Sequence, residues 1–154
     1  MSLMNTRRNA LQQSLAVAGL LATAGLWPGR ALAFTKAAFD AKNMAEAVRA
    51  LGGQPPMASK DISLEVPEIA DNGAAVRVSF STTLPRVQRM LLLAEKNPTP
   101  LVAVFNVSES IEPSFIINTK LSESTDVLAV AMLADGRVLF TKKPVKVTLG
   151  ACGN

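Results

Sequence analysis

The C-terminus carries the side chain of this protein that is best suited to covalent chemistry. The chain ends in Gly150-Ala151-Cys152-Gly153-Asn154, and Cys152 is the only cysteine in 154 residues. The thiolate form of cysteine is a strong nucleophile, but an ordinary thiol has a pKa of about 8.5 and is mostly protonated at neutral pH. Because the small neighbours of Cys152 include no general base, its activation has to come from whatever binds the tail.

Three interpretations of Cys152 are open. A lone cysteine is commonly buried in a core, but the small residues beside Cys152 offer little to pack against. An unpaired cysteine in an exported protein can also form an intermolecular disulfide. As a functional thiol, it would sit on an extended arm of residues 150–154 that spans about 16 Å. Such an arm, with few bulky side chains, could enter a narrow channel of another protein, and the sequence favours this third interpretation.

Three lysines, Lys142, Lys143 and Lys146, lie upstream of the tail. Cations close to a thiol favour its thiolate form and attract anions. The simpler interpretation is that the lysines form the solvated surface of a strand, and this is the one we prefer.

The composition excludes several classes of function. Histidine is absent, so a Ser-His-Asp triad, a Cys-His pair and a histidine-ligated zinc site cannot form. The acidic residues show no spacing typical of a calcium loop. Three of the 16 basic residues lie in the first 33 positions, and the remaining charges almost balance. Trp and Tyr are absent after residue 33, which argues against nucleic-acid binding. We expect no metal and no resident cofactor.

Residues 1–33 have the organisation of a cleaved export signal. Arg7-Arg8 form a positive region, 15–27 is an apolar run, and 31–33 reads Ala-Leu-Ala, a typical cleavage site. The apolar run is too short for a stable transmembrane helix. The cleavage site has no cysteine near it to carry a lipid, so we expect no membrane anchor.

The paired arginines resemble those of a twin-arginine signal. The ordinary secretory route is the alternative, because Ala10 and Gln12 stand where the twin-arginine motif prefers Phe and Lys. Either route delivers the mature chain, which begins near residue 34, outside the cytoplasm. We expect a periplasmic protein.

The segment 34–51 has helical periodicity. Its apolar residues fall near one helical face, and Gly52-Gly53 provide a stop. The members of that face are Phe39, Met44, Ala47, Val48 and Leu51. We therefore predict one short helix at the edge of the domain.

After Pro55-Pro56 the pattern changes to the period of two that is typical of strands. Asp71-Asn72-Gly73 is a turn cluster, and Asp135-Gly136 predicts a hairpin. Strands are predicted at 62–66, 76–80, 87–94, 101–107, 114–118, 127–133, 137–141 and 145–149. Short strands at this spacing predict an all-β, immunoglobulin-like β-sandwich over 34–149, followed by a flexible arm at 150–154.

Two predicted strands are apolar on both faces. Residues 90–94 read MLLLA and residues 101–105 read LVAVF, whereas a strand in a two-layer sandwich normally turns one face to water. The second face could be covered by the N-terminal helix or by a partner subunit. The sequence leaves both interpretations open.

Four segments resemble the SoxY family, the sulfur-carrier subunits of the periplasmic thiosulfate-oxidising (Sox) system. They are VPEIADNGAAVRVSF at 66–80, LLLAEKNPTPLVAVF at 91–105, the Asp135-Gly136 hairpin and VKVTLGACGN at 145–154. The resemblance covers essentially the whole mature chain. It implies an immunoglobulin-like sandwich that pairs with a SoxZ-like subunit and is not itself an enzyme.

The resemblance also implies the role of the tail. Cys152 would be the covalent attachment site for sulfur intermediates, and Gly150, Ala151 and Gly153 would form the carrier arm. The implied partners are a SoxXA-like cytochrome that conjugates thiosulfate to the thiol, a SoxB-like hydrolase that releases sulfate and, where present, a sulfane dehydrogenase. Ala151 and Asn154 stand where the family usually has glycine.

The main hypothesis is therefore a covalent carrier of sulfur intermediates in periplasmic thiosulfate oxidation. The alternative is an exported structural or interaction sandwich that is tied to a partner through a disulfide of Cys152. A small-molecule-binding domain is a weaker third hypothesis, because the sequence offers no convergent set of polar residues.

Overall fold

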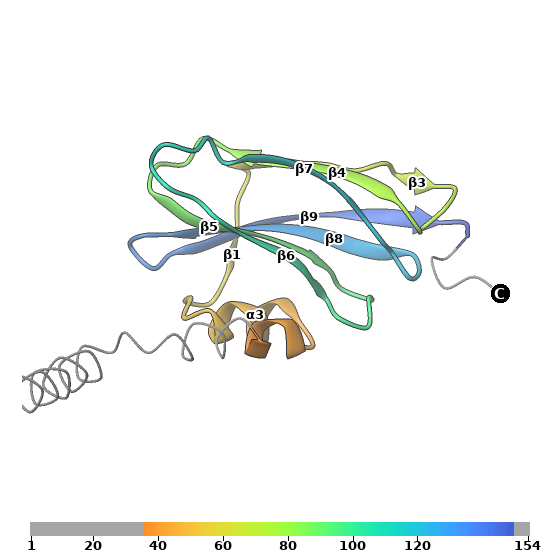
Figure 1. Cartoon of the computed structure of the whole chain (residues 1–154), viewed down its shortest axis with the longest axis horizontal. Coiled ribbons are helices and arrows are strands. Elements are labelled where there is room, and N and C mark those ends of the chain that lie inside the picture. The colour runs from red at the N-terminus through yellow and green to blue at the C-terminus, as the bar shows by residue number, and fades with distance from the viewer. Residues whose placement is uncertain (1–35, 150–154) are drawn as a thin grey trace, which may run out of the picture. The chain divides into compact units, whose positions relative to one another are not determined.

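The computed structural model describes residues 36–149, which form two β-sheets packed face to face (Figure 1). The strands are β1 (Met57–Ala58), β2 (Ile62–Glu65), β3 (Ile69–Ala70), β4 (Val76–Thr82), β5 (Val87–Ala94), β6 (Leu101–Asn106), β7 (Ser114–Thr119), β8 (Thr125–Leu133) and β9 (Val138–Val147). The larger sheet has the order β1-β9-β8-β5-β6, with β3 also paired to β9, and the smaller sheet has the order β2-β4-β7. The predicted immunoglobulin-like sandwich is confirmed.

The C-terminal end of the sandwich differs from the prediction. The two strands predicted at 137–141 and 145–149 are one strand, β9, which pairs with β8 from Val138 to Val145. Pro144 does not interrupt β9, because β1 and β3 pair with its other edge only on either side of this position. A proline has no N–H to donate, so it fits a strand position that faces such a gap.

The predicted single helix is also wrong. Residues 36–40 are helical, and a separate helix, α3 (Met44–Ala50), follows them. The Asn43 side chain accepts a hydrogen bond from the Glu46 backbone N–H at 2.9 Å, and the Glu46 carboxylate accepts one from the Lys42 N–H at 2.9 Å. These bonds form an N-cap, which starts a new helix at this point. The hydrogen bond from Lys42 also lowers the pKa of Glu46. The stop at Gly52 is confirmed, with φ of +81°.

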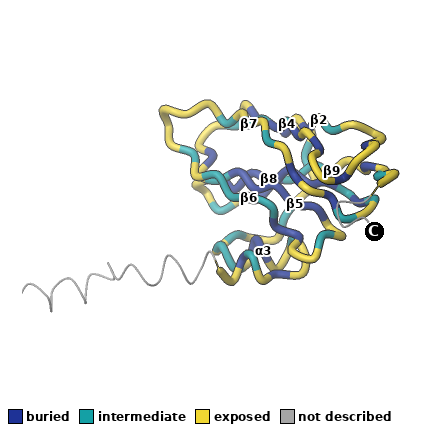
Figure 2. Tube along the Cα trace, turned by 45° about the vertical axis from the view of Figure 1, so that its right-hand side comes forward, coloured by how far each residue is buried: buried dark blue, intermediate teal, exposed yellow. Residues whose placement is uncertain are grey.

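The helix covers the outer face of the larger sheet, and this explains the apolar character of β5. Met90 and Leu92 lie in the core between the two sheets, whereas Leu91 and Leu93 pack in a second cluster with Val48 of α3. Figure 2 shows β8 and β5 as largely buried between these two layers. For β5, the open choice between helix and partner is therefore resolved in favour of the helix. β6 is different, since 102–105 stay half-buried. Among the described residues, no helix is long and apolar enough to cross a membrane.

Gly53 lies at a close contact between the helix and the larger sheet. A Cβ at this position would lie 2.6 Å from Val48 Cγ1, 2.8 Å from Met132 Cε and 2.9 Å from Val138 Cγ2. We expect Gly53→Ala to lower the free energy of unfolding by about 1–3 kcal/mol, because it overpacks this layer. Urea denaturation measures the change. Gly52→Asn is the control. A side chain at this position meets open space, and asparagine tolerates positive φ, so this variant should lower the free energy of unfolding by less than about 1 kcal/mol. Equal losses in the two variants would contradict the proposed contact.

Candidate functional site

The structure describes the base of the tail, but Cys152 and the arm residues Gly150, Ala151 and Gly153 lie outside the described residues. Their predicted roles are therefore not tested by the geometry. The structure shows which hydrogen bonds fix the backbone as far as Leu149. We call the residues that hold it there, 70–73, 124 and 147–149, the tail platform.

On one side of the tail platform, β3 and the turn that follows it hold the end of β9. The Thr148 N–H donates to the Ala70 carbonyl at 3.0 Å, and the Thr148 hydroxyl donates to the Asp71 carbonyl at 2.9 Å. The Gly73 N–H donates to the Leu149 carbonyl at 2.7 Å. The backbone is thus hydrogen-bonded up to the residue that directly precedes the predicted arm.

A serine from a distant loop holds the same segment on its other side. The Val147 N–H donates to the Ser124 hydroxyl oxygen at 2.9 Å, so β9 stays tied to the start of β8 beyond the last paired residue of that ladder. The turn itself is held by the Leu121 N–H, which donates to the Gly73 carbonyl at 2.8 Å. The predicted arm therefore starts from a fixed point of the fold.

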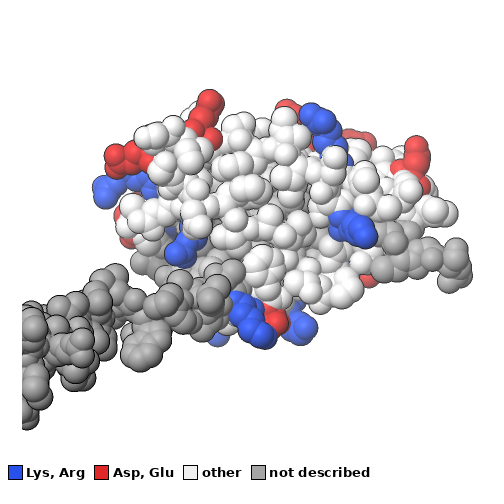
Figure 3. Space-filling model, in the orientation of Figure 1, with Lys and Arg blue, Asp and Glu red and all other residues white. Residues whose placement is uncertain are grey.

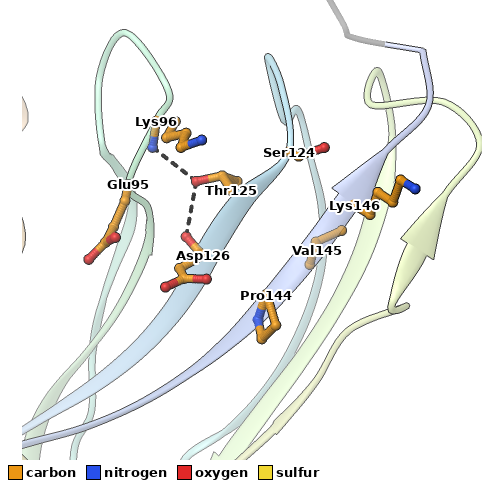
Figure 4. A pocket seen from close by; sticks show the side chains of 8 residues that line it. All are labelled: Glu95, Lys96, Ser124, Thr125, Asp126, Pro144, Val145 and Lys146. Carbon is orange, nitrogen blue, oxygen red and sulfur yellow. Dashed lines mark hydrogen bonds between the residues drawn. The ribbon is translucent and has the colours of Figure 1, made fainter.

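A shallow pocket of about 330 Å³ lies next to the tail platform (Figure 4). Its lining consists of Glu95, Lys96, Ser124, Thr125, Asp126, Pro144, Val145 and Lys146. The Lys96 backbone N–H donates to the buried Thr125 hydroxyl oxygen at 2.9 Å, which fixes one wall of the pocket. Two acidic and two basic side chains line it, so its charges do not by themselves select an anion.

The three lysines upstream of the tail are exposed, as expected for a solvated strand surface. The Lys142 ammonium group donates a hydrogen bond to the Asp126 carboxylate at 2.8 Å. This hydrogen bond raises the pKa of Lys142. Lys146 lines the pocket beside the tail platform. In the described part of the chain, no group of three His, Cys, Asp or Glu side chains could hold a metal ion.

The AEKNP stretch at 94–98 has a structural role. The Asn97 side-chain amide donates to the Lys120 carbonyl at 2.8 Å, and its oxygen accepts from the Ser122 N–H at 3.0 Å. Asn97 thus joins the β5–β6 turn to the loop that leads to Ser124. Sequence reasoning missed Asn97, Ser124 and Thr148 as supports of the tail. The only signal was the Asp71-Asn72-Gly73 turn, since the partners of the other residues lie far away in sequence.

Thr148 offers a test of the tail platform. Thr148→Val keeps the shape of the side chain but removes the hydroxyl bond to the Asp71 carbonyl. We expect the free energy of unfolding to fall by about 0.5–1.5 kcal/mol and the Gly73 amide to exchange its hydrogen faster. Thr141→Val is the same change further back on β9 and should leave the exchange of Gly73 unaltered. Unchanged exchange at Gly73 in both variants would show that Thr148 does not hold the platform.

Comparisons with known proteins agree with the fold and with the resemblance of the sequence. The chain matches the family described as sulfur oxidation protein SoxY over residues 47–152. It is similar to the solved structure of the sulfur carrier protein SoxY from Chlorobium limicola f thiosulfatophilum, with a TM-score of 0.60 and 27% identity, covering 66% of this chain and 92% of that one.

A second similar structure is a superoxide reductase (neelaredoxin) from Ignicoccus hospitalis, with a TM-score of 0.50 and 18% identity over 56% of this chain and 79% of that one. At this identity the likeness shows the fold alone. No curated protein matches the chain in sequence. The family match covers most of the chain, from α3 through the sandwich to Cys152. The chain therefore belongs to the SoxY family of sulfur oxidation proteins.

Proposed function

We propose that the chain is a covalent carrier in periplasmic thiosulfate oxidation, with Cys152 as the attachment site for sulfur intermediates. The observation that carries this proposal is the family match, which runs through residue 152 and so includes the only cysteine of the chain. The tail platform supports it, because the fold holds the backbone at Leu149 and leaves residues 150–154 as the proposed arm.

The chemistry requires two steps at the thiol, each performed with a partner enzyme. In the first, the Cys152 thiolate and the terminal sulfur of thiosulfate form an S–S bond, and two electrons pass to a SoxXA-like cytochrome. In the second, a SoxB-like hydrolase adds water to the sulfonate group, which leaves as sulfate with two protons while a persulfide stays on Cys152. Where a sulfane dehydrogenase is present, three water molecules supply the oxygen atoms that convert the outer sulfur of the persulfide into a sulfonate, and six protons and six electrons are released, the electrons to the acceptor of that enzyme. The carrier is a co-substrate of these enzymes and not a catalyst.

The arm has to reach the reacting centres of these partners. Gly150, Ala151 and Gly153 add little bulk beside the thiol, so a narrow channel can accept them. Ala151 carries one methyl group more than the glycine usual in the family. We propose export through the signal at 1–33, by the twin-arginine route and together with a SoxZ-like subunit, so that the working form is a heterodimer.

Intact-mass measurement tests the attachment site. The mature chain is incubated with thiosulfate and an oxidised SoxXA-like cytochrome. We expect a mass increase of one thiosulfate that maps to the peptide containing Cys152. Cys152→Ser should stay unmodified, whereas Ala151→Gly should be modified at least as fast as the natural chain. Modification elsewhere in the chain, or none when the enzymes act on another carrier, would refute the proposal.

Alkylation of the native protein separates the carrier from the disulfide-tethered alternative. Only the thiolate is nucleophilic, so a free thiol with an ordinary pKa near 8.5 reacts about tenfold more slowly for each unit by which the pH lies below that value. We expect Cys152 in the native chain to react with iodoacetamide as fast as it does in the urea-unfolded chain. A covalent dimer on non-reducing gels, together with slow alkylation of the native chain, would favour the structural alternative.

A further inference from the structure

The turn after β3 contains the only Asn-Gly pair of the chain, Asn72-Gly73. The side chain of an asparagine can be attacked at Cγ by the backbone nitrogen of the residue that follows it. Glycine favours this attack, because it has no side chain beside the nitrogen and its backbone adopts many conformations. Asn72 is exposed, so water reaches its carboxamide, whereas Gly73 is buried. Figure 3 shows the surface at the end of the sandwich on which Figure 1 draws β3, where acidic side chains reach the outside.

The local geometry favours this reaction at the carboxamide. The Asn72 Oδ1 accepts a hydrogen bond from the Ala74 backbone N–H at 2.8 Å. The ring that this bond closes contains both Asn72 Cγ and the Gly73 nitrogen, so the carboxamide is held beside the backbone of the turn. The Ala74 N–H also stabilises the negative charge that develops on Oδ1 when a nitrogen adds to Cγ.

The tail platform opposes the same reaction at the nitrogen. The Gly73 N–H donates to the Leu149 carbonyl at 2.7 Å, and the Gly73 carbonyl accepts a hydrogen bond from the Leu121 N–H at 2.8 Å. The nitrogen has to lose its proton and turn toward Cγ before it can attack. Both changes break the hydrogen bond to Leu149, the residue that directly precedes the proposed arm. The attachment of the tail therefore controls the reactivity of the turn.

We propose that Asn72 is a deamidation site whose rate is set by the hydrogen bond between Gly73 and Leu149. When that bond opens, a base removes the Gly73 amide proton and the nitrogen forms a bond to Asn72 Cγ. The bond between Cγ and Nδ2 then breaks, Nδ2 leaves as ammonia with the added proton, and a cyclic succinimide remains. Water opens this ring at either carbonyl, which leaves aspartate or isoaspartate at position 72.

The isoaspartate product loosens the contact that restrained its formation. Its backbone runs through Cβ and Cγ, which adds one carbon atom between Cα of residue 72 and the Gly73 nitrogen. Gly73 then cannot keep its hydrogen bonds to both Leu149 and Leu121 in their present geometry. The modification therefore frees the end of β9 from the turn. The aspartate product keeps the length of the backbone and leaves these bonds in place.

This inference is independent of the carrier function proposed above, because it concerns only the turn and the end of β9. Cys152→Ser is used as the background in every sample, so that reactions of the thiol do not add to the measured masses.

Ageing of the mature chain at mildly alkaline pH, followed by peptide mass analysis, tests the site. Conversion of the amide to an acid changes the mass of the peptide that contains Asn72, and methylation by an isoaspartyl methyltransferase identifies the isoaspartate. We expect the native chain to react at Asn72 at least about tenfold more slowly than the urea-unfolded chain, because the restrained nitrogen reacts only from an opened state. Asn97 is an internal control and should stay unmodified, since Pro98 has no N–H with which to attack.

Thr148→Val tests the control by the tail platform. It removes the hydroxyl bond to the Asp71 carbonyl and so weakens the segment beside Leu149. We expect Asn72 to react about two- to tenfold faster in this variant, whereas Thr141→Val, further back on β9, should leave the rate unchanged. Equal rates in the native and the unfolded chain would overturn the inference, and so would equal rates in the two variants.

Ser124→Ala provides a second way to weaken the tail platform. It removes the hydroxyl oxygen that accepts a hydrogen bond from the Val147 N–H, and it should speed the reaction of Asn72 as well. Thermal unfolding of each variant shows whether it still folds. A chain that is converted when unfolded, but that stays unmodified at Asn72 in the natural form and in both weakened variants, would contradict the proposal.

Hydrogen exchange tests the release of the turn. The Leu121 amide, which donates to the Gly73 carbonyl, should exchange faster in the isoaspartate form of the aged chain than in the fresh chain. Asn72→Asp carries the same added charge without the longer backbone and should leave this exchange unaltered. Unaltered exchange in the isoaspartate form, or equally fast exchange in Asn72→Asp, would show that the longer backbone does not free the end of β9.

Discussion

The larger sheet is buried on both faces, and the rest of the structure depends on this double burial. Along β5, alternate side chains enter two different clusters, one between the sheets and one beneath α3. β8 follows the same rule along most of its length. Burial of a leucine or valine side chain contributes about 1.5–3 kcal/mol, so a central pair of strands buried on both faces concentrates much of the stabilisation of the domain.

That concentration of buried residues explains how a short tail can start from a fixed point. β9 is hydrogen-bonded to β8 along most of its length, and β8 is one of the most deeply buried strands. Beyond the ladder, Ser124 on one side and the turn after β3 on the other continue the hydrogen bonding to Leu149. The sandwich therefore provides a fixed starting point for the residues to which the proposed carrier chemistry is assigned.

The strands were largely predictable because their signal is local. A period of two predicted β4 at 76–80, close to its observed bounds, and the Asp135-Gly136 pair predicted the hairpin, in which Gly136 has φ of +88°. The two errors had different causes, one local and one from tertiary contacts. Local periodicity continued through Asn43, but side-chain capping ended one helical segment and began the next. The two strands predicted at 137–141 and 145–149 are one strand that continues through Pro144, because β1 and β3 leave a gap at that position.

The sequence by itself limited the chemistry that the chain can perform, because the presence of a single cysteine and the absence of histidine do not depend on folding. It also determined the alternation that makes a sandwich. Only the tertiary structure decided what covers the second face of β5, which residues hold Thr148, and that β6 is the outermost described strand of the larger sheet. Each of these features depends on hydrogen bonds and packing between segments that are far apart along the chain, and no local sequence pattern indicates such contacts.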